Sequence, residues 1–177
     1  MKIEKSTIKS EAVFSDDHKF RYLLHREWIR ERRHAMVLSI SPSSQVGVNS
    51  DLTTMLITTN VNKADYGGFS LVNLISAVDV EAKKLKSTNG LIGDDTDKYI
   101  TEAAKASDII ILAYGKIAAV NKAFAERETE VLKLLEPYAN KLHFITDVMG
   151  REMLHPLTPS IRNSWLLQPY HSADSKK

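Results

Sequence analysis

Short and almost uninterrupted hydrophobic runs alternate with longer amphipathic stretches along this chain. The runs occupy residues 35–40 (AMVLSI), 69–75 (FSLVNLI), 108–113 (DIIILA) and 142–146 (LHFIT). Unbroken Ile, Val and Leu runs of this length predict strands that are covered on both faces, as in a mostly parallel sheet. Two earlier runs, 12–15 and 20–25, flank an aspartate-rich turn and predict an N-terminal β-hairpin.

The stretches between these runs predict helices. They cover residues 50–62, 80–85, 95–106 and 117–135. Ser50 or Asp51 is able to cap the first helix, and Pro137 closes the last, in which apolar residues recur at helical spacing. Strands that alternate with helices predict an α/β fold, a three-layer α/β/α sandwich with a mostly parallel central sheet.

Length and composition fit one ordinary domain. The chain has 177 residues and no cysteine, which excludes disulfides, thiolate zinc sites and a cysteine nucleophile, and we expect a cytoplasmic protein. No apolar run approaches the roughly 20 residues of a membrane span, so no membrane partner is expected. We expect residues 12–170 to form the domain, with an extension at 1–11 and a flexible tail at 171–177.

Charge is unevenly distributed, although the formal net charge is only +2. Between His18 and His34, six basic residues face two acids, and three aromatic residues lie among them. Such a mixture can stack bases and neutralise phosphates. The predicted nucleic-acid contacts are Arg21, Arg26, Arg30 and Arg33. In the alternative interpretation, Phe20, Tyr22 and Trp28 pack inward and the charges form a solvated face.

Two polar stretches follow predicted strands, at the places where ligands gather in open α/β sheets. Ser41 to Ser44 (SPSS) offers hydroxyls and backbone N–H groups to a phosphate, a carboxylate or a base edge. Tyr114, Gly115 and Lys116 join the third run to a helix, and the glycine permits close backbone approach. Both stretches have an ordinary alternative, because serine, proline and glycine are common turn formers.

Two further residues are candidates for chemistry. His155, which is restrained by the following proline, could act as an acid, a hydrogen-bond donor or an electrophile near neutral pH, or could be a surface residue. Asn73 interrupts an apolar run and needs hydrogen-bond partners, as a structural clamp or as a ligand contact.

Several common catalytic motifs are missing from the sequence. It contains no G-x-x-x-x-G-K-[ST], G-x-G-x-x-G, G-x-S-x-G or H-E-x-x-H. The acidic run at 93–97 (GDDTD) precedes a predicted helix and reads as capping rather than as a metal loop. We therefore predict neither a metal nor a cofactor.

The order of these motifs resembles a known family. The segments AVFSDDHKFRYLLHREW, MVLSISPSS, NSDLTT, LVNLIS, DIIILAYG and HPL resemble an uncharacterised bacterial and phage family, domain-of-unknown-function family 1643, from about residue 12 to residue 159. Members of that family usually have Asn where this chain has Ser41, and Trp where it has Tyr114.

A more distant resemblance is to the uracil-DNA glycosylase superfamily. It is carried by a polar Pro-containing loop after a strand, an apolar strand that ends in a W-G-like pair, and a late His-Pro loop, here at Ser41, Tyr114 and His155. The resemblance implies a similar α/β sandwich, with a loop that positions water and a histidine that stabilises a departing base.

Two functions remain open. The first is a nucleobase-, nucleotide- or nucleic-acid-binding protein, and if it is an enzyme, a hydrolase or glycosylase. Its predicted catalytic residues are His155, Asp51 and Ser41, and its ligand contacts are Ser43, Asn73, Tyr114, Gly115 and Lys116. The second is a non-catalytic phage or mobile-element accessory protein that sequesters a small ligand or blocks a host protein. A pocket with Asp51 within hydrogen-bond reach of a bound water would favour the enzyme, and a site lined by Ser41, Gly115 and His155 without any carboxylate would favour binding alone.

Overall fold

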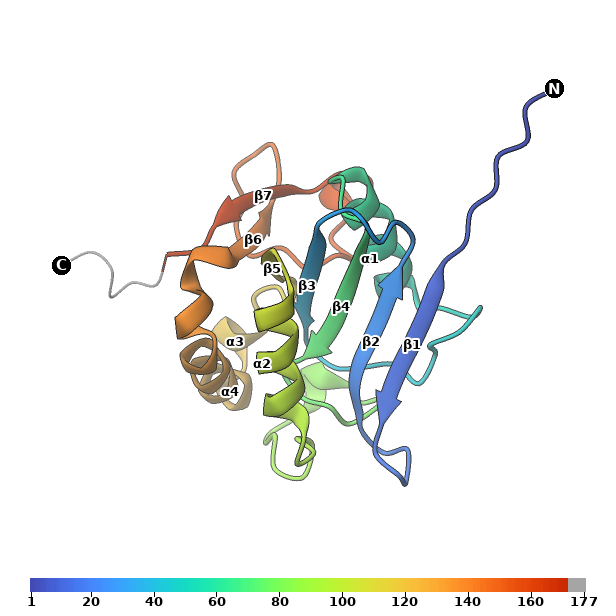
Figure 1. The fold of residues 1–177 in the computed structure, drawn as a ribbon. Helices are drawn as coiled ribbons and strands as arrows, with labels where there is room; N and C mark the ends of the chain where they lie inside the picture. Colours follow the sequence, from blue (N-terminus) through green and yellow to red (C-terminus); the bar gives the residue numbers. More distant parts are fainter. Residues whose placement is uncertain (172–177) are drawn as a thin grey trace.

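The computed structural model describes residues 1–171, apart from the side chain of residue 83, and contains one seven-stranded sheet (Figure 1). Its strands are β1 (Lys9–Phe14), β2 (Arg21–Glu27), β3 (His34–Ser39), β4 (Gly68–Asn73), β5 (Ile109–Leu112), β6 (Leu142–Thr146) and β7 (Leu166–Pro169). Their order across the sheet is β1-β2-β4-β3-β5-β6-β7. The strands predicted from the four long apolar runs are confirmed, whereas β7 was missed because LLQP is short and mostly exposed.

The prediction of a mostly parallel sheet was wrong. Strands β4, β3, β5 and β6 run parallel at the centre, but three of the six pairings in the described sheet are antiparallel. The predicted hairpin is confirmed as β1 and β2, and it adds to β4 in the antiparallel sense. Strand β7 returns antiparallel to β6 at the other edge. The result is a mixed α/β sheet with a parallel centre.

Four α-helices connect or flank the strands. They are α1 (Leu52–Lys63), α2 (Thr96–Ala106), α3 (Ile117–Val120) and α4 (Lys122–Leu134), and 3-10 turns occupy Ala82–Lys84, Glu136–Lys141 and Pro159–Ile161. The single helix predicted over 117–135 is broken at Asn121, which is extended at φ −136° and ψ 112°. Its side-chain oxygen accepts from the Ala123 N–H and starts α4 there, because asparagine competes well for backbone groups at helix starts.

Helices cover both faces of the sheet centre, which explains the unbroken apolar runs. Alternate side chains of a strand point to opposite faces. Met36 and Leu38 pack with α2 and α4, whereas Val37 packs with Ile57 and Val61 of α1. No helix among the described residues is both long and apolar enough to cross a membrane. The carboxyl ends of β3 and β4 are therefore fixed between two packed layers.

The predicted domain boundary near the N-terminus can be compared with the structure, whereas most of the predicted C-terminal tail cannot. Strand β1 begins at Lys9, earlier than the expected start of the domain at residue 12, and the preceding residues extend away from the sheet in Figure 1. Most of the predicted flexible tail, 172–177, lies outside the described residues.

Candidate functional site

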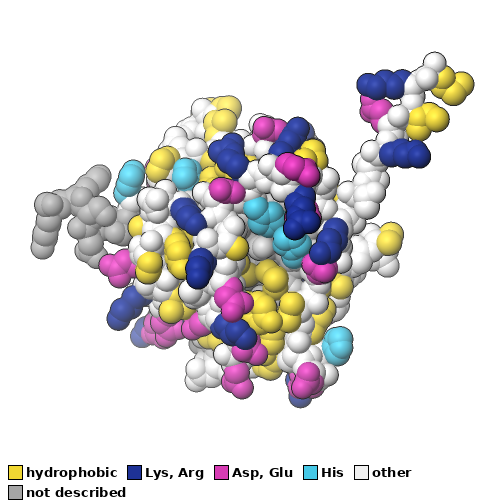
Figure 2. Space-filling view, viewed as in Figure 1, with side chains coloured by type: hydrophobic (Ala, Val, Ile, Leu, Met, Phe, Trp, Pro, Cys, Tyr) yellow, Lys and Arg dark blue, Asp and Glu magenta, His cyan; other side chains and the backbone are white. Residues whose placement is uncertain are grey.

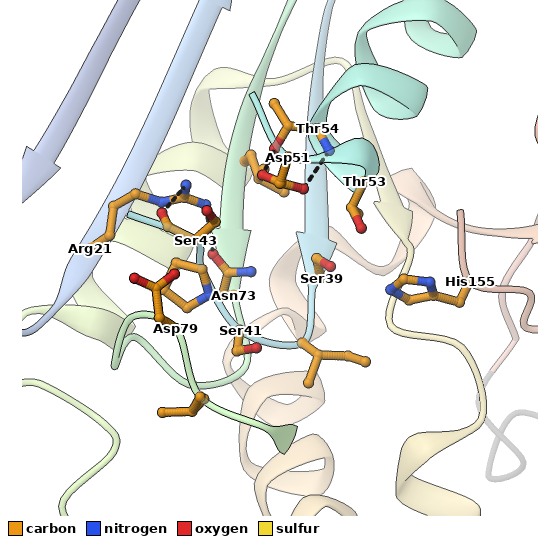
Figure 3. Close-up of a pocket in the computed structure, with 14 residues that line it drawn as sticks. Arg21, Ser39, Ser41, Ser43, Asp51, Thr53, Thr54, Asn73, Asp79 and His155 are labelled. Carbon is orange, nitrogen blue, oxygen red and sulfur yellow. Dashed lines mark hydrogen bonds between the residues drawn. The ribbon is translucent and has the colours of Figure 1, made fainter. Parts of the chain in front are cut away.

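Two cavities meet at the carboxyl ends of the parallel strands. One, of about 260 Å³, is lined mainly by polar side chains and is called the polar chamber below (Figure 3). The other, of about 620 Å³, is lined by Tyr114, Gly115, Ile117, Leu157 and their neighbours and is called the apolar hollow. Ile40 and His155 line both. Most of the predicted site residues therefore converge on one region.

The polar chamber collects residues that are distant in the sequence. Ser41 and Ser43 come from the loop after β3, Asp51 from the start of α1, and Asn73 from the end of β4. In Figure 3, His155 reaches toward the chamber from the side opposite Asn73. The sequence predicted each of these residues separately, and the parallel pairing of β3 with β4 brings the strand ends together.

Arg21 enters the chamber as a buried cation. The side chain is 2% exposed, and its Nη1 donates to the Ser43 carbonyl at 2.9 Å. Its Nη2 donates to Asn73 Oδ1 at 3.4 Å. Burial lowers the pKa of Arg21 to about 10, against the opposing effect of the Asp51 and Asp79 carboxylates. The group therefore stays charged at neutral pH and holds the serine loop against the end of β4.

The Arg21 contact fixes the orientation of the Asn73 amide. Since Oδ1 faces the guanidinium, the amide nitrogen must face the other way, and Figure 3 shows it directed toward Ser39 and the open chamber. Asn73 is 3% exposed, and its Nδ2 has no hydrogen-bond partner among the described residues. The chamber thus presents a buried donor that is not satisfied within the described chain.

Asp51 acts as the N-cap of α1. Its Oδ1 accepts from the Thr54 N–H at 2.9 Å and its Oδ2 accepts from Thr54 Oγ1 at 2.7 Å. This confirms the expectation that Ser50 or Asp51 caps the helix. Both carboxylate oxygens are already engaged with α1, although the side chain lines the chamber.

Asp79 is a chamber residue that the sequence analysis missed. It lies after β4 with a positive φ of 55°. Its N–H donates to the Pro42 carbonyl at 3.0 Å, and its Oδ1 accepts from the Ser44 N–H at 3.1 Å. The sequence gives no local signal for Asp79, because nothing in the surrounding residues (SAVDV) indicates that this loop folds back onto the loop after β3.

The chain was compared with protein-family models, curated proteins and solved structures. A family model described as "Protein of unknown function (DUF1643)" matches residues 21–157, which is most of the chain. The chain belongs to this family. The match begins at Arg21 and extends through His155, so it spans the residues of the polar chamber named above. Neither the curated proteins nor the solved structures give a match, and the likeness to uracil-DNA glycosylases gains no support from them.

The apolar hollow is closed on one side by a tight contact between Gly115 and His155. Gly115 has φ of 67°, and a Cβ added to it would lie 2.9 Å from the His155 Cβ. Only glycine permits both this backbone conformation and this approach. Tyr114 is 1% exposed, and burial raises the pKa of its hydroxyl, so it remains neutral. In this DUF1643 member, Gly115 therefore lies directly against the histidine that lines both cavities.

A second contact set holds the loop that carries His155. The buried Asp147 carboxylate accepts from Ser160 Oγ at 2.9 Å, from the Arg151 Nε at 2.8 Å and from two backbone N–H groups. Burial alone would raise the pKa of Asp147, but these hydrogen bonds lower it to about 2. The His155 Nδ1 accepts from the Leu157 N–H at 3.2 Å, so a neutral ring carries its proton on Nε2.

The proposed basic arm does not form one exposed surface. Arg21 and Arg26 are 2% and 7% exposed, because β2 lies inside the sheet between β1 and β4. Arg26 donates to the Gly47 carbonyl at 3.2 Å and to Ser50. Arg33 is exposed and lies over the Tyr66 ring. As in the inward-packing interpretation, Tyr22 is buried.

Arg30 is exposed in the loop between β2 and β3, at the opposite end of β3 from the chamber residue Ser41. Figure 2 shows Lys and Arg side chains interspersed with Asp and Glu over the visible face, rather than gathered in one stripe. The exposed arginines therefore mark a different region from the polar chamber.

Proposed function

We propose that this protein binds a nucleobase in the polar chamber, either free or as part of a nucleoside or nucleotide. The observation that carries the proposal is the buried Asn73 amide nitrogen, which lacks a partner among the described residues and is directed into the chamber. Leaving such a donor unpaired costs about 1–3 kcal/mol. A ligand with a carbonyl or ring-nitrogen acceptor would offset that cost.

The two adjoining cavities match the polar rim and the flat faces of a nucleobase. Bases have a rim of donors and acceptors and flat faces that pack on apolar or aromatic groups. The polar chamber offers Asn73, Ser41 and Ser43 to the rim, and the apolar hollow offers aliphatic side chains such as Val120 and Leu157 to the faces. Lys116 lies at the wall of the hollow, where it would accompany a phosphate of a nucleotide.

The position of the exposed arginines favours a small ligand over a nucleic acid that follows the basic segment. Arg30 and Arg33 precede β3, whereas Ser41 follows it. A six-residue strand spans about 20 Å. Contacts of Arg30 and Arg33 with nucleic acid would therefore be separate from ligand binding in the chamber.

A hydrolase or glycosylase reaction is the catalytic form of this proposal. His155 carries a proton on Nε2 when its ring is neutral and would stabilise a departing base, while Ser41 and Asp51 would position water. One observation favours the non-catalytic alternative, a protein that sequesters the ligand: both Asp51 oxygens already accept hydrogen bonds from Thr54.

Calorimetry with a panel of free bases, nucleosides and nucleotides tests the proposal. We expect binding to the wild-type protein and at least about a tenfold loss in Asn73→Leu, since a buried hydrogen bond contributes on the order of 1.4 kcal/mol. Asn163→Leu, at an exposed position outside both cavities, is the matched control. Chromatography of the same mixtures distinguishes release of a base from binding alone. If no member of the panel binds at millimolar concentration, the proposal is wrong.

A further inference from the structure

Asp79 holds the serine loop in place through two hydrogen bonds but leaves one carboxylate oxygen available. The Asp79 N–H and Oδ1 bond to Pro42 and Ser44. Oδ2 makes no hydrogen bond with any other residue in the described part of the chain. Figure 3 shows this carboxylate on the same side of the chamber as Asn73 and Arg21. The oxygen that is left free therefore belongs to an exposed side chain on the wall of the chamber that also carries Asn73.

The two carboxylates of the chamber are not equivalent. Asp51 uses Oδ1 and Oδ2 for the first turn of α1, with both bonds going to Thr54. Asp79 uses only Oδ1, and that bond rigidifies the side chain without occupying Oδ2. Although the sequence pointed to Asp51, Asp79 is the carboxylate with capacity for a ligand.

The backbone at Asp79 has a left-handed conformation, which it shares with Asp65 outside the chamber. A positive φ of 55° is uncommon for residues other than glycine and is tolerated best by Asn and Asp. Backbone conformations of this kind tend to occur where a site fixes a side chain for binding. Here the conformation is over-determined by the bonds to Pro42 and Ser44, and it places the side chain at the chamber wall.

We propose that Asp79 determines the specificity of the polar chamber: its Oδ2 accepts a hydrogen bond from an N–H of the bound base, while Asn73 Nδ2 donates to an acceptor elsewhere on the same base. The inference rests on the proposed function and narrows its ligand class. The ligand presents at least one donor for Asp79 and one acceptor for Asn73. Bases whose donor nitrogen is fully methylated lack the first contact and are rejected.

The decisive variant is Asp79→Asn. Asparagine tolerates the positive φ and keeps an oxygen for the Ser44 N–H, but it replaces the free acceptor with an NH₂ donor. We expect base affinity to fall about 10- to 100-fold, as for loss of a hydrogen bond to a charged group. Asp65→Asn is the matched control, because Asp65 also has a positive φ of 65° and lies outside the chamber.

Methylated bases test the same contact from the ligand, and calorimetry measures the affinity of each base and of its methylated partner. The pairs are uracil and 3-methyluracil, hypoxanthine and 1-methylhypoxanthine, adenine and N6,N6-dimethyladenine, and cytosine and N4,N4-dimethylcytosine. We expect the methylated partner of the best-bound base to bind the wild-type protein at least about tenfold more weakly. In Asp79→Asn the methylation penalty should largely disappear, because both changes remove the same contact.

The outcomes separate this inference from the proposed function. If bases bind and Asn73→Leu weakens them, but Asp79→Asn and methylation do not, the inference is wrong and the proposed function stands. If no base binds the wild-type protein, both are wrong. Should Asp79→Asn lose its fold by circular dichroism, Asp79→Gly keeps the positive φ without the carboxylate, and unchanged affinity in that variant would overturn the inference.

Discussion

Two buried arginines lie near the end of β4 and are satisfied to different degrees. Arg127 of α4 is 2% exposed, and its Nε donates to the Leu74 carbonyl at 2.7 Å. Its remaining nitrogens pair with Asp97 of α2 and with Glu130, at 3.3 Å for the latter. Arg21 is equally buried, yet it bonds a carbonyl and an amide oxygen, and its Nε has no partner among the described residues.

The difference shows how a structural cation can be distinguished from one that serves a site. Arg127 joins α4, α2 and the chain after β4, and the two carboxylates balance its charge. Arg21 lies beside a cavity and orients Asn73, whose nitrogen is unpaired as well. Two unsatisfied polar groups that both lie beside one cavity are what the proposed ligand-binding role of the Arg21 region would leave in the unliganded protein.

The largest expected effect distinguishes these two arginines directly. Arg127→Met should lower the free energy of unfolding by about 3 kcal/mol, because it leaves the buried Leu74 carbonyl without its donor and breaks the link between α2 and α4. Arg21→Met should cost less, about 1–2 kcal/mol, because it leaves the Ser43 carbonyl and Asn73 Oδ1 without a donor but does not break a link between two helices. Urea unfolding followed by tryptophan fluorescence measures both.

Ligand binding should reverse that order. Base affinity should fall at least about tenfold in Arg21→Met, because the Asn73 amide loses the contact that orients it, and should stay unchanged in folded Arg127→Met. Equal losses of stability in the two variants would contradict the distinction between a structural and a site arginine.

A second comparison concerns two glycines with positive φ, Gly115 in the wall of the apolar hollow and Gly90 before α2. A Cβ at Gly115 would lie 2.9 Å from the His155 Cβ, whereas one at Gly90 would meet nothing within 4 Å. The backbone conformation alone costs an alanine about 1–2 kcal/mol at either position. Gly115→Ala should therefore lose about 1 kcal/mol more than Gly90→Ala, and it alone should weaken base binding by displacing His155.

Unfolding midpoints and calorimetry of the two glycine variants provide the measurements. Identical losses of stability together with unchanged affinity would mean that His155 moves aside freely, and the proposed positioning role of Gly115 would be wrong.

The sequence predicted the parts of this molecule that depend on local pattern. Unbroken apolar runs identified β3, β4, β5 and β6, and turn chemistry identified the hairpin. Strand-end placement singled out Ser41 and His155, and interruption of an apolar run singled out Asn73; all three line one chamber. The strand predictions worked because strand burial follows from short-range residue order.

What the sequence could not predict depends on long-range pairing. Arg21 looked like an exposed phosphate contact, because nothing local shows that β2 becomes an interior strand beside β4. Asp79 was missed because its importance comes from hydrogen bonds to a loop more than 30 residues earlier. The antiparallel outer pairings were likewise hidden, since apolar runs do not encode strand direction.

The smallest expected effect concerns the N-cap residues of α1 and α2. Asp51 caps α1 with two hydrogen bonds to Thr54, whereas Asp95 precedes α2 without any side-chain cap bond. Asp51→Ala should lower the free energy of unfolding by about 1 kcal/mol, and Asp95→Ala should change it by less than about 0.5 kcal/mol.

Base affinity in the two aspartate variants then tests whether capping is the main role of Asp51. If capping accounts for this residue, Asp51→Ala should weaken binding less than Asp79→Asn does, because Asp51 has both oxygens committed to the helix. Calorimetry with the best-bound base decides the point. A larger loss in Asp51→Ala would make Asp51 the ligand-facing carboxylate, and it would restore the assignment that the sequence favoured.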